Sequence, residues 1–415
     1  MRLFMDTARM GPACPSASQA LCEFARLAAD DPSLYSLAFL RHGADVWPES
    51  VRVSYPELAR WQGVSNLRRM FAESFLVADP RQVFLANRTA QLVRLAARVM
   101  FRQCRHVLTT DMNWPAWQAI VEDESIRQGR RTTQIPLAQA VIEECWSAND
   151  VANHLASAFR QHACDGLFLP VVSNLGVAIP VTQLVATLRA NHEVRFVLAD
   201  AAQAFCQIPN PSLADAADVT IVGCHKWLGA HLPMGVAVAG NPVIAEQLRC
   251  VMANRESSGR LHDPLLSLTE QLLSDHVNRY SETVNVTTML TANAALSASQ
   301  ASPDRLNSAY QERLRNLDFV LDCFSESSWT PKRLHLSMRS AILLANGPTT
   351  SDELSGPDER QARFRDNGVA LTAYRDGSIR LSMPSTRMSD EHRDCLTKAL
   401  NHVSNWKSPK HFVLA

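Results

Sequence analysis

The sequence lacks long apolar segments. None of the hydrophobic runs in its 415 residues approaches the ~20 residues that a membrane-spanning helix needs, so we expect no membrane partner. The first residues, Met1–Asp6, already contain charged side chains, which is too early for the apolar core of a signal peptide. Together these two absences favour a cytoplasmic protein.

The sequence also lacks an excess of charge of either sign. It contains 41 basic and 41 acidic residues, so neither nucleic acid nor an anionic membrane is an evident partner. Its ten cysteines are scattered and include no CxxC pair, which argues against a zinc site and against a disulfide framework. We therefore expect no bound metal and, in a cytoplasmic protein, reduced thiols.

Internal repeats and low-complexity tracts are absent as well. Hydrophobic residues make up 46% of the chain and charged residues 20%, the balance of an ordinary globular protein. A chain of 415 residues is too long for one hydrophobic core, so we expect two domains.

Two short apolar runs in the middle of the sequence are each followed by a residue with an ionisable side chain. Phe196–Ala199 stops at Asp200, and Val219–Val222 reaches Lys226 after two small residues and a histidine. Runs of this kind, rich in Val and Ile, are typical of buried parallel strands. Ligands of open α/β sheets bind outside the carboxyl ends of such strands. The pattern therefore places Asp200 and Lys226 at one edge of a sheet.

A lysine and an acid at neighbouring strand ends suit pyridoxal phosphate. This cofactor needs a lysine amine for its Schiff base and a carboxylate at its ring nitrogen, so that the protonated ring draws electrons from a substrate carbanion. Taken singly, Lys226 and Asp200 are better interpreted as a surface lysine and a helix-capping aspartate. The surrounding sequence decides between these interpretations.

The segments Val197–Gln203 and Gly223–Gly229 together resemble the class V aminotransferase family of fold-type I pyridoxal phosphate enzymes. The motif HKWLG, residues 225–229, is most similar to the isopenicillin N epimerase-like branch of the family. Cysteine desulfurases and kynureninases resemble this chain less closely. Further matches follow in the family's order along nearly the whole chain: Asp6–Ala8, Asn87–Thr89, Ser173–Gly176, Thr283–Asn285 and Ile379–Ser382.

The resemblance implies an α/β fold like that of aspartate aminotransferase. A mixed, mostly parallel seven-stranded sheet would form the large domain, and a smaller α+β domain would follow it. We expect three parts: an N-terminal segment, residues 1–35, that packs on the small domain; a large cofactor-binding domain, 36–285; and a small C-terminal domain, 286–415.

The resemblance also implies which residues hold the cofactor ring. Lys226 would form the Schiff base and Asp200 would face the ring nitrogen, while Asn174 and Gln203 would reach the phenolic oxygen. The ring itself would stack on Trp114. Met112 is the alternative at that position, and Trp114 could instead be ordinary core, because aromatic residues are buried for packing in every fold.

The resemblance implies that the cofactor phosphate binds at the start of a helix, near Thr89, which without the resemblance is better interpreted as an ordinary capping threonine. A helix N-terminus offers free backbone N–H groups and the positive end of a dipole. The resemblance adds the backbone amide of Arg88 and the side chain of His225. Gly223 stands where relatives carry Ser or Asn, so one side-chain contact to the phosphate is lost.

A further phosphate contact is expected to come from a second subunit. In relatives, the residue matched by Thr283 reaches the cofactor of the neighbouring subunit, which implies a homodimer with shared active sites. Relatives have Gly immediately before this threonine, whereas this chain has Glu282, so the backbone of the loop can differ here.

Arg380 is the residue expected to bind the substrate. A guanidinium pairs with both oxygens of a carboxylate and so can hold an α-amino acid. In relatives, the arginine of this RLS-like strand has that role. Lys226 would act twice, first in the Schiff base and then as the base that moves a proton at Cα.

These residues indicate a pyridoxal phosphate enzyme that acts on an amino acid, with transamination favoured. An epimerase, or a C–S or C–C lyase of the kynureninase type, is the alternative, because the same residues serve each reaction. A cysteine desulfurase also needs a mobile-loop cysteine before the final arginine, and no cysteine lies between Cys323 and Cys395. A non-catalytic, cofactor-binding regulator is a remote alternative. Loss of catalysis would most readily remove Lys226, Asp200 or Arg380, and all three are present. A regulator should also carry a basic DNA-binding segment, and none is visible in the sequence.

Overall fold

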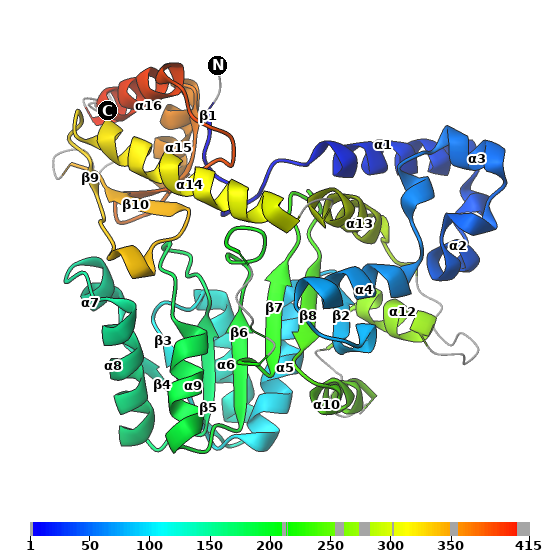
Figure 1. Ribbon diagram of the computed structural model, residues 1–415, viewed down its shortest axis with the longest axis horizontal. Coiled ribbons are helices and arrows are strands. Elements are labelled where there is room, and N and C mark those ends of the chain that lie inside the picture. Colours follow the sequence, from blue (N-terminus) through cyan, green and yellow to red (C-terminus); the bar gives the residue numbers. More distant parts are fainter. Residues whose placement is uncertain are drawn as a thin grey trace, which may run out of the picture.

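The computed structural model describes residues 3–209, 213, 215–253, 261–273, 283–300, 303–348 and 356–404. A seven-stranded sheet forms its centre, in the order β2-β8-β7-β6-β5-β3-β4 (Figure 1). The strands are β2 (Val83–Ala86), β3 (His106–Thr110), β4 (Arg131–Ile135), β5 (Gly166–Pro170), β6 (Phe196–Asp200), β7 (Val219–Gly223) and β8 (Gly235–Ala239). Strand β8 runs antiparallel to both of its neighbours, β2 and β7, and the other four pairs of neighbouring strands are parallel, so the predicted mixed, mostly parallel sheet of seven strands is confirmed.

The sheet is buried on both faces, which explains why its strands are almost entirely apolar. Along β6, Phe196 and Leu198 join one hydrophobic cluster, whereas Val197 and Ala199 join the other. The cluster behind Phe196 and Leu198 includes helices α5 (Thr89–Gln103) and α10 (Pro242–Ala253). The opposite cluster includes α4 (Val64–Ser74), α8 (Ala148–Gln161), α9 (Val181–Asn191) and α13 (Thr287–Gln300).

A smaller antiparallel sheet lies in the C-terminal part of the chain, in the order β12-β13-β10-β9. Its strands are β9 (Thr330–Pro331), β10 (Ile342–Asn346), β12 (Thr372–Ala373) and β13 (Ser378–Ser382). Helices α14 (Pro303–Phe324), α15 (Pro357–Asp366) and α16 (Asp390–Ser404) accompany this sheet (Figure 1). The residue boundaries of the three predicted parts stay predictions.

The N-terminal segment contacts two parts of the structure, strand β11 and helix α13. Strand β1 (Leu3–Phe4) pairs in parallel with β11 (Val369–Ala370), beside the C-terminal helices. Helix α1 (Pro15–Asp30) then packs on α13, and α1, α2 (Leu37–His42) and α3 (Glu49–Ser54) extend from one side of the molecule (Figure 1). The remaining helices are α6 (Pro115–Arg127), α7 (Ala138–Ile142) and α12 (Pro264–Leu273).

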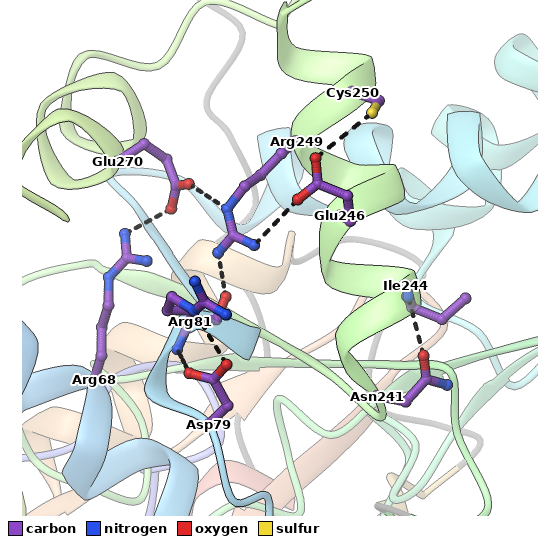
Figure 2. A network of polar contacts seen from close by, with 9 residues as sticks. All are labelled: Arg68, Asp79, Arg81, Asn241, Ile244, Glu246, Arg249, Cys250 and Glu270. Carbon is purple, nitrogen blue, oxygen red and sulfur yellow. Dashed lines mark hydrogen bonds and ion pairs between the residues drawn. The ribbon is translucent and has the colours of Figure 1, made fainter. Parts of the chain in front are cut away.

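A chain of ion pairs joins three helices near strand β2 (Figure 2). Arg68 of α4, which is fully buried, places Nη2 2.8 Å from Glu270 Oε1 of α12. The other oxygen of Glu270 accepts a hydrogen bond of 2.9 Å from Arg249 Nε of α10. Burial lowers the pKa of Arg68, and Glu270 opposes that shift. Glu270 is therefore the carboxylate that allows the Arg68 guanidinium to be buried.

In the part of the chain that the structure describes, no helix combines the length and the apolar character needed to cross a membrane.

Candidate active site

Asp200 and Lys226 lie at the same edge of the large sheet. Strand β6 ends at Asp200, and its parallel neighbour β7 ends at Gly223, three residues before Lys226. The predicted arrangement of two parallel neighbouring strands is thus confirmed. It follows from the sheet order that the loops after β6 and β7 emerge side by side.

A cavity of about 420 Å³ opens at this edge. Its lining combines residues that are far apart in the sequence, from the N-terminal segment to β13. Ten residues singled out in the sequence line it: Arg88, Thr89, Met112, Trp114, Asn174, Asp200, Gln203, His225, Lys226 and Arg380. Thr283 is exposed and is not part of this lining. Glu282, immediately before it, lies outside the described residues.

The electrostatics of the cavity centre on the lysine and the acid. Burial lowers the pKa of the Lys226 amine to about 8; Asp200 opposes this shift and Arg380 adds to it. Burial raises the pKa of the Asp200 carboxyl, and three groups oppose that shift: the Ala202 amide, Lys226 and the side chain of Trp117. The Ala202 amide donates a hydrogen bond of 2.9 Å to Asp200 Oδ1. Lys226 can therefore both hold and accept a proton near neutral pH.

Helix α5 points its N-terminus into the cavity. Arg88 is the N-cap and Thr89 the first helical residue, one position earlier than the sequence pattern predicts. No side chain caps this end, so the first-turn N–H groups of α5 are available to an anion. A Cβ on Gly235 would lie 2.7 Å from Thr89 N and Cα, so glycine at this position lets β8 pass close to the helix start.

The Arg88 backbone amide already has a partner within the chain. It donates to Asp263 Oδ2 over 3.3 Å, and the Asn87 amide donates to Asp263 Oδ1 over 3.1 Å. Asp263 directly precedes α12 and is far from Arg88 in the sequence, so sequence reasoning could not anticipate this contact. Arg88 itself is exposed and lines the cavity.

His225 lies beside the same helix end. Its Nδ1 is buried without a hydrogen-bond partner among the described residues. Burial, with a smaller contribution from Lys226, lowers the pKa of the imidazole to about 4, so the ring is neutral at physiological pH. A Cβ on Gly223 would lie 3.3 Å from His225 Cε1 and 3.7 Å from Thr89 Oγ1. The position that relatives fill with Ser or Asn thus faces both predicted phosphate contacts.

Gln203 is held at both ends of its amide. Its Nε2 donates to the Ala8 carbonyl over 2.7 Å, and its Oε1 accepts from the Trp227 indole over 2.9 Å. An amide nitrogen carries two hydrogens, so one remains for a ligand. Asn174 also lines the cavity, and its backbone carbonyl accepts a hydrogen bond of 3.3 Å from Arg380 Nη1.

Three large side chains border the cavity near the start of α6. Met112 is fully buried, whereas Trp114, the N-cap of α6, is 43% exposed. Trp117 also lines the cavity, and its side chain acts on the pKa of Asp200. Sequence reasoning missed Trp117, although its spacing of three residues from Trp114 puts the two on one helix face. The choice between Met112 and Trp114 as stacking partner stays a prediction.

Arg380 enters the cavity from β13 and is 5% exposed. Its Nη2 donates to Thr372 Oγ1 over 3.2 Å and lies 3.9 Å from Asp6 Oδ1. Its Nε is buried without a partner among the described residues. The ring of Tyr374 lies 5.9 Å from the guanidinium carbon. Sequence reasoning assigned no role to Thr372 or Tyr374, because neither lies in a recognisable motif.

The N-terminal segment crosses the loop that carries Lys226. The Gly11 amide donates to the His225 carbonyl over 2.8 Å, and the Cys14 amide donates to the Gly229 carbonyl over 2.9 Å. A Cβ on Gly11 would lie 1.9 Å from the Lys226 carbonyl oxygen, so only glycine fits there. In the described residues, no group of three or more His, Cys, Asp or Glu side chains could hold a metal ion.

The family model for aminotransferase class V matches residues 55–320, more than half of the chain. The protein belongs to the class V aminotransferase family. No curated protein matches the sequence. The isopenicillin N epimerase-like branch stays a prediction.

Several solved enzyme structures align with this chain over almost its full length. Cysteine desulfurase CsdA from Escherichia coli aligns with a TM-score of 0.72 at 14% identity, over 97% of this chain and 94% of that chain. Ureidoglycine–glyoxylate aminotransferase from Bacillus subtilis gives 0.67 at 12% identity, over 97% and 92%. The cystine C–S lyase C-DES, solved with its product cysteine persulfide, gives 0.66 at 15% identity, over 98% of each chain. These likenesses confirm the fold-type I architecture of this class V chain.

Proposed function

We propose that this class V chain is a pyridoxal phosphate enzyme that transfers the amino group of an amino acid. One observation carries the proposal: a single cavity brings together the amine of Lys226, the buried carboxylate of Asp200 and the guanidinium of Arg380. Each of these groups suits a different part of the reaction, and together they account for the cofactor ring, the proton transfer and the substrate.

The polar groups of the cavity fit pyridoxal phosphate. The uncapped start of α5 and the unpartnered Nδ1 of His225 can take up the phosphate. Asp200 is buried, and burial raises the pKa of its carboxyl. The positive charge of a protonated ring nitrogen would stabilise the ionised form of this carboxyl. Lys226 would be the point of covalent attachment, and the remaining N–H of Gln203 would face the phenolic oxygen.

When bound, pyridoxal phosphate supplies an electron sink for the negative charge that develops at the substrate Cα. Arg380 would hold the substrate carboxylate and so fix the direction of the Cα–H bond. The neutral Lys226 amine would take the Cα proton, because its pKa of about 8 leaves it a competent base near neutral pH. Asp200 would keep the proton on the ring nitrogen throughout.

The thiol chemistry of a desulfurase has less support in this cavity. A desulfurase needs a cysteine to receive sulfur, and no cysteine is among the described residues that line the cavity. Transamination would need only the groups already named, because Lys226 could both take a proton from the substrate Cα and give a proton back. Transamination is therefore the reaction that we put first.

We also propose that the enzyme is a homodimer in which Thr283 completes the neighbouring site. Thr283 is exposed and does not line the cavity of its own chain, which fits a contact made to another subunit. Sedimentation of the wild type, together with the cofactor affinity of Thr283→Val, tests this proposal. A monomer, or an unchanged affinity, would contradict it.

The decisive experiment follows the absorbance of the purified protein with pyridoxal phosphate, for the wild type and Lys226→Ala. Borohydride should fix the cofactor to Lys226 in the wild type, as mapped by peptide mass spectrometry, and not in the variant. A panel of L-amino acids is then added without an acceptor. One amino acid should convert the cofactor to its pyridoxamine form and release the matching 2-oxo acid.

The same panel separates the other reactions. Exchange of the Cα hydrogen with solvent deuterium, with a D-amino acid as product, would replace transamination with epimerisation. Release of sulfide or of a side-chain fragment would indicate a lyase. A protein that binds no cofactor, even with excess pyridoxal phosphate, would overturn the enzyme assignment.

A further inference from the structure

A second cavity of about 580 Å³ lies behind the loop that carries Lys226. We call it the α14 cavity, because α14 forms one wall and supplies Arg305, Leu306, Ala309 and Arg313. The other walls come from α13, which lies between α4 and the start of α14 (Figure 1), and from the loops after Gln203 and Lys226. Its size is within the ~300–1,000 Å³ typical of sites for small molecules.

Arg313 is the unusual residue of this cavity. It is 7% exposed, yet no described carboxylate lies within ion-pair distance of its guanidinium. Its Nη1 donates to the carbonyls of Cys206 and Gln207 over 3.1 and 3.0 Å, and its Nε is buried without a partner among the described residues. Burial lowers the pKa of Arg313 to about 10. A buried charged side chain is normally paired with a group of opposite charge. The Arg313 guanidinium has no such partner among the described residues.

The remaining walls of the cavity are mainly apolar. Phe205, Leu296 and Leu306 all line it. The one carboxylate on the lining, Glu73, is already engaged by Arg69 Nη1 at 2.8 Å. Arg305 adds a second cation at the exposed side. The cavity thus combines a wide apolar surface with uncompensated positive charge.

We propose that the α14 cavity binds a small monocarboxylate with an apolar body. The carboxylate pairs with the Arg313 guanidinium, and the apolar body covers Phe205, Leu296 and Leu306. Such a ligand supplies the missing counter-charge and removes apolar surface from water at the same time. This site is separate from the Lys226 cavity, and its existence does not depend on which reaction the enzyme catalyses.

The indole of Trp227 connects the two cavities, because it lines the α14 cavity and is hydrogen-bonded to Gln203, which lines the Lys226 cavity. Its ring lies 5.2 Å from the Arg313 guanidinium carbon, and its N–H donates to Gln203 Oε1 over 2.9 Å. A ligand at Arg313 would therefore lie beside the side chain that holds Gln203.

Calorimetric titration of the cofactor-loaded protein with octanoate tests the proposal, with octanamide as an uncharged probe of the same shape. Octanoate should bind at one site per chain and octanamide at least roughly tenfold more weakly, because it lacks a charge-assisted hydrogen bond. Arg313→Gln should weaken octanoate binding by a similar factor. Arg380→Gln, which removes a guanidinium from the other cavity, should leave octanoate binding unchanged.

A second variant tests the cavity without touching the charge. Ala309→Phe places a ring in the α14 cavity, keeps Arg313, and should abolish octanoate binding; circular dichroism checks that both variants fold. Absence of octanoate binding to the wild type would overturn the proposal. So would equal binding of octanamide, retained binding in Ala309→Phe, or a loss of binding in Arg380→Gln alone.

Discussion

Asp6 and Arg380, from opposite ends of the chain, meet beside the cavity that Lys226 and Arg380 line. Asp6 Oδ1 lies 3.9 Å from Arg380 Nη2, and the hydroxyl of Thr372 bridges them, because it donates to Asp6 and accepts from Arg380. The buried carboxylate therefore fixes the hydroxyl in the orientation that holds the guanidinium. Asp6 also pairs with Arg9 at 2.7 Å, so the N-terminal segment positions the expected substrate-binding residue.

Replacing Thr372 with valine tests this relationship, because the shape is kept and the bridging hydroxyl is lost. The Michaelis constant for the amino acid should rise by roughly tenfold, the effect of one hydrogen bond to a charged group, with a smaller change in kcat. Thr372→Ser keeps the hydroxyl and should behave as the wild type. Steady-state kinetics give both constants. An unchanged Michaelis constant in Thr372→Val would mean that Arg380 is held without the bridge.

The reactivity of Lys226 should depend on pH with a midpoint near 8. An ordinary lysine titrates near ~10.4, and burial lowers the pKa of Lys226 to about 8. Only the neutral amine is nucleophilic, so labelling of Lys226 by trinitrobenzenesulfonate in cofactor-free protein should increase with pH and level off above this pKa. Peptide mass spectrometry measures the labelling of this lysine separately from the others.

Two substitutions should move that midpoint in opposite directions. Arg380 lowers the pKa of Lys226, so Arg380→Gln should shift the labelling midpoint upward. Asp200 raises the pKa of Lys226, so Asp200→Asn should shift it downward. If both variants kept the midpoint of the wild type, the charges of Asp200 and Arg380 would not act on the lysine.

The features predictable from the sequence are those set by short segments. Two parallel strands with polar residues at one edge of the large sheet can be predicted from two apolar runs. One run is followed by Asp200, and the other by His225 and Lys226. The position of Thr89 at a helix start was predicted to within one residue from the same kind of local pattern. Arg380 needed the family resemblance, because an arginine within an apolar strand does not by itself reveal what it binds.

The remaining features depend on contacts between distant segments. Asp263 takes up the Arg88 amide, and Thr372 bridges Asp6 and Arg380; neither pairing leaves a spacing pattern in the sequence. The α14 cavity is formed by segments that no motif links. Such features follow from the packing of elements, which periodicity in one segment does not specify.

The ion pairs around Glu270 should contribute strongly to stability. Glu270→Gln leaves the fully buried Arg68 without a carboxylate, which should lower the free energy of unfolding by about 3–5 kcal/mol. The double variant Arg68→Met with Glu270→Leu replaces the charges by apolar groups and should recover most of that loss. Urea denaturation measures all three proteins. Equal stability of Glu270→Gln and the wild type would mean that Arg68 does not need a carboxylate partner to stay buried.

Glycine at position 11 should be required for the lysine loop to keep its place. A Cβ there would lie 1.9 Å from the Lys226 carbonyl oxygen, a backbone atom that a rotamer change cannot move away. Gly11→Ala should therefore displace the N-terminal segment or the Lys226 loop and weaken cofactor binding.

Gly356→Ala is the matched control, because its Cβ would meet nothing within 4 Å and its φ of −64° suits alanine. Cofactor affinity measured by absorbance should fall in Gly11→Ala and stay unchanged in Gly356→Ala. A Gly11→Ala protein with the affinity of the wild type would show that the segment can move aside without disturbing Lys226, and that its contacts to the loop are not needed to hold the cofactor.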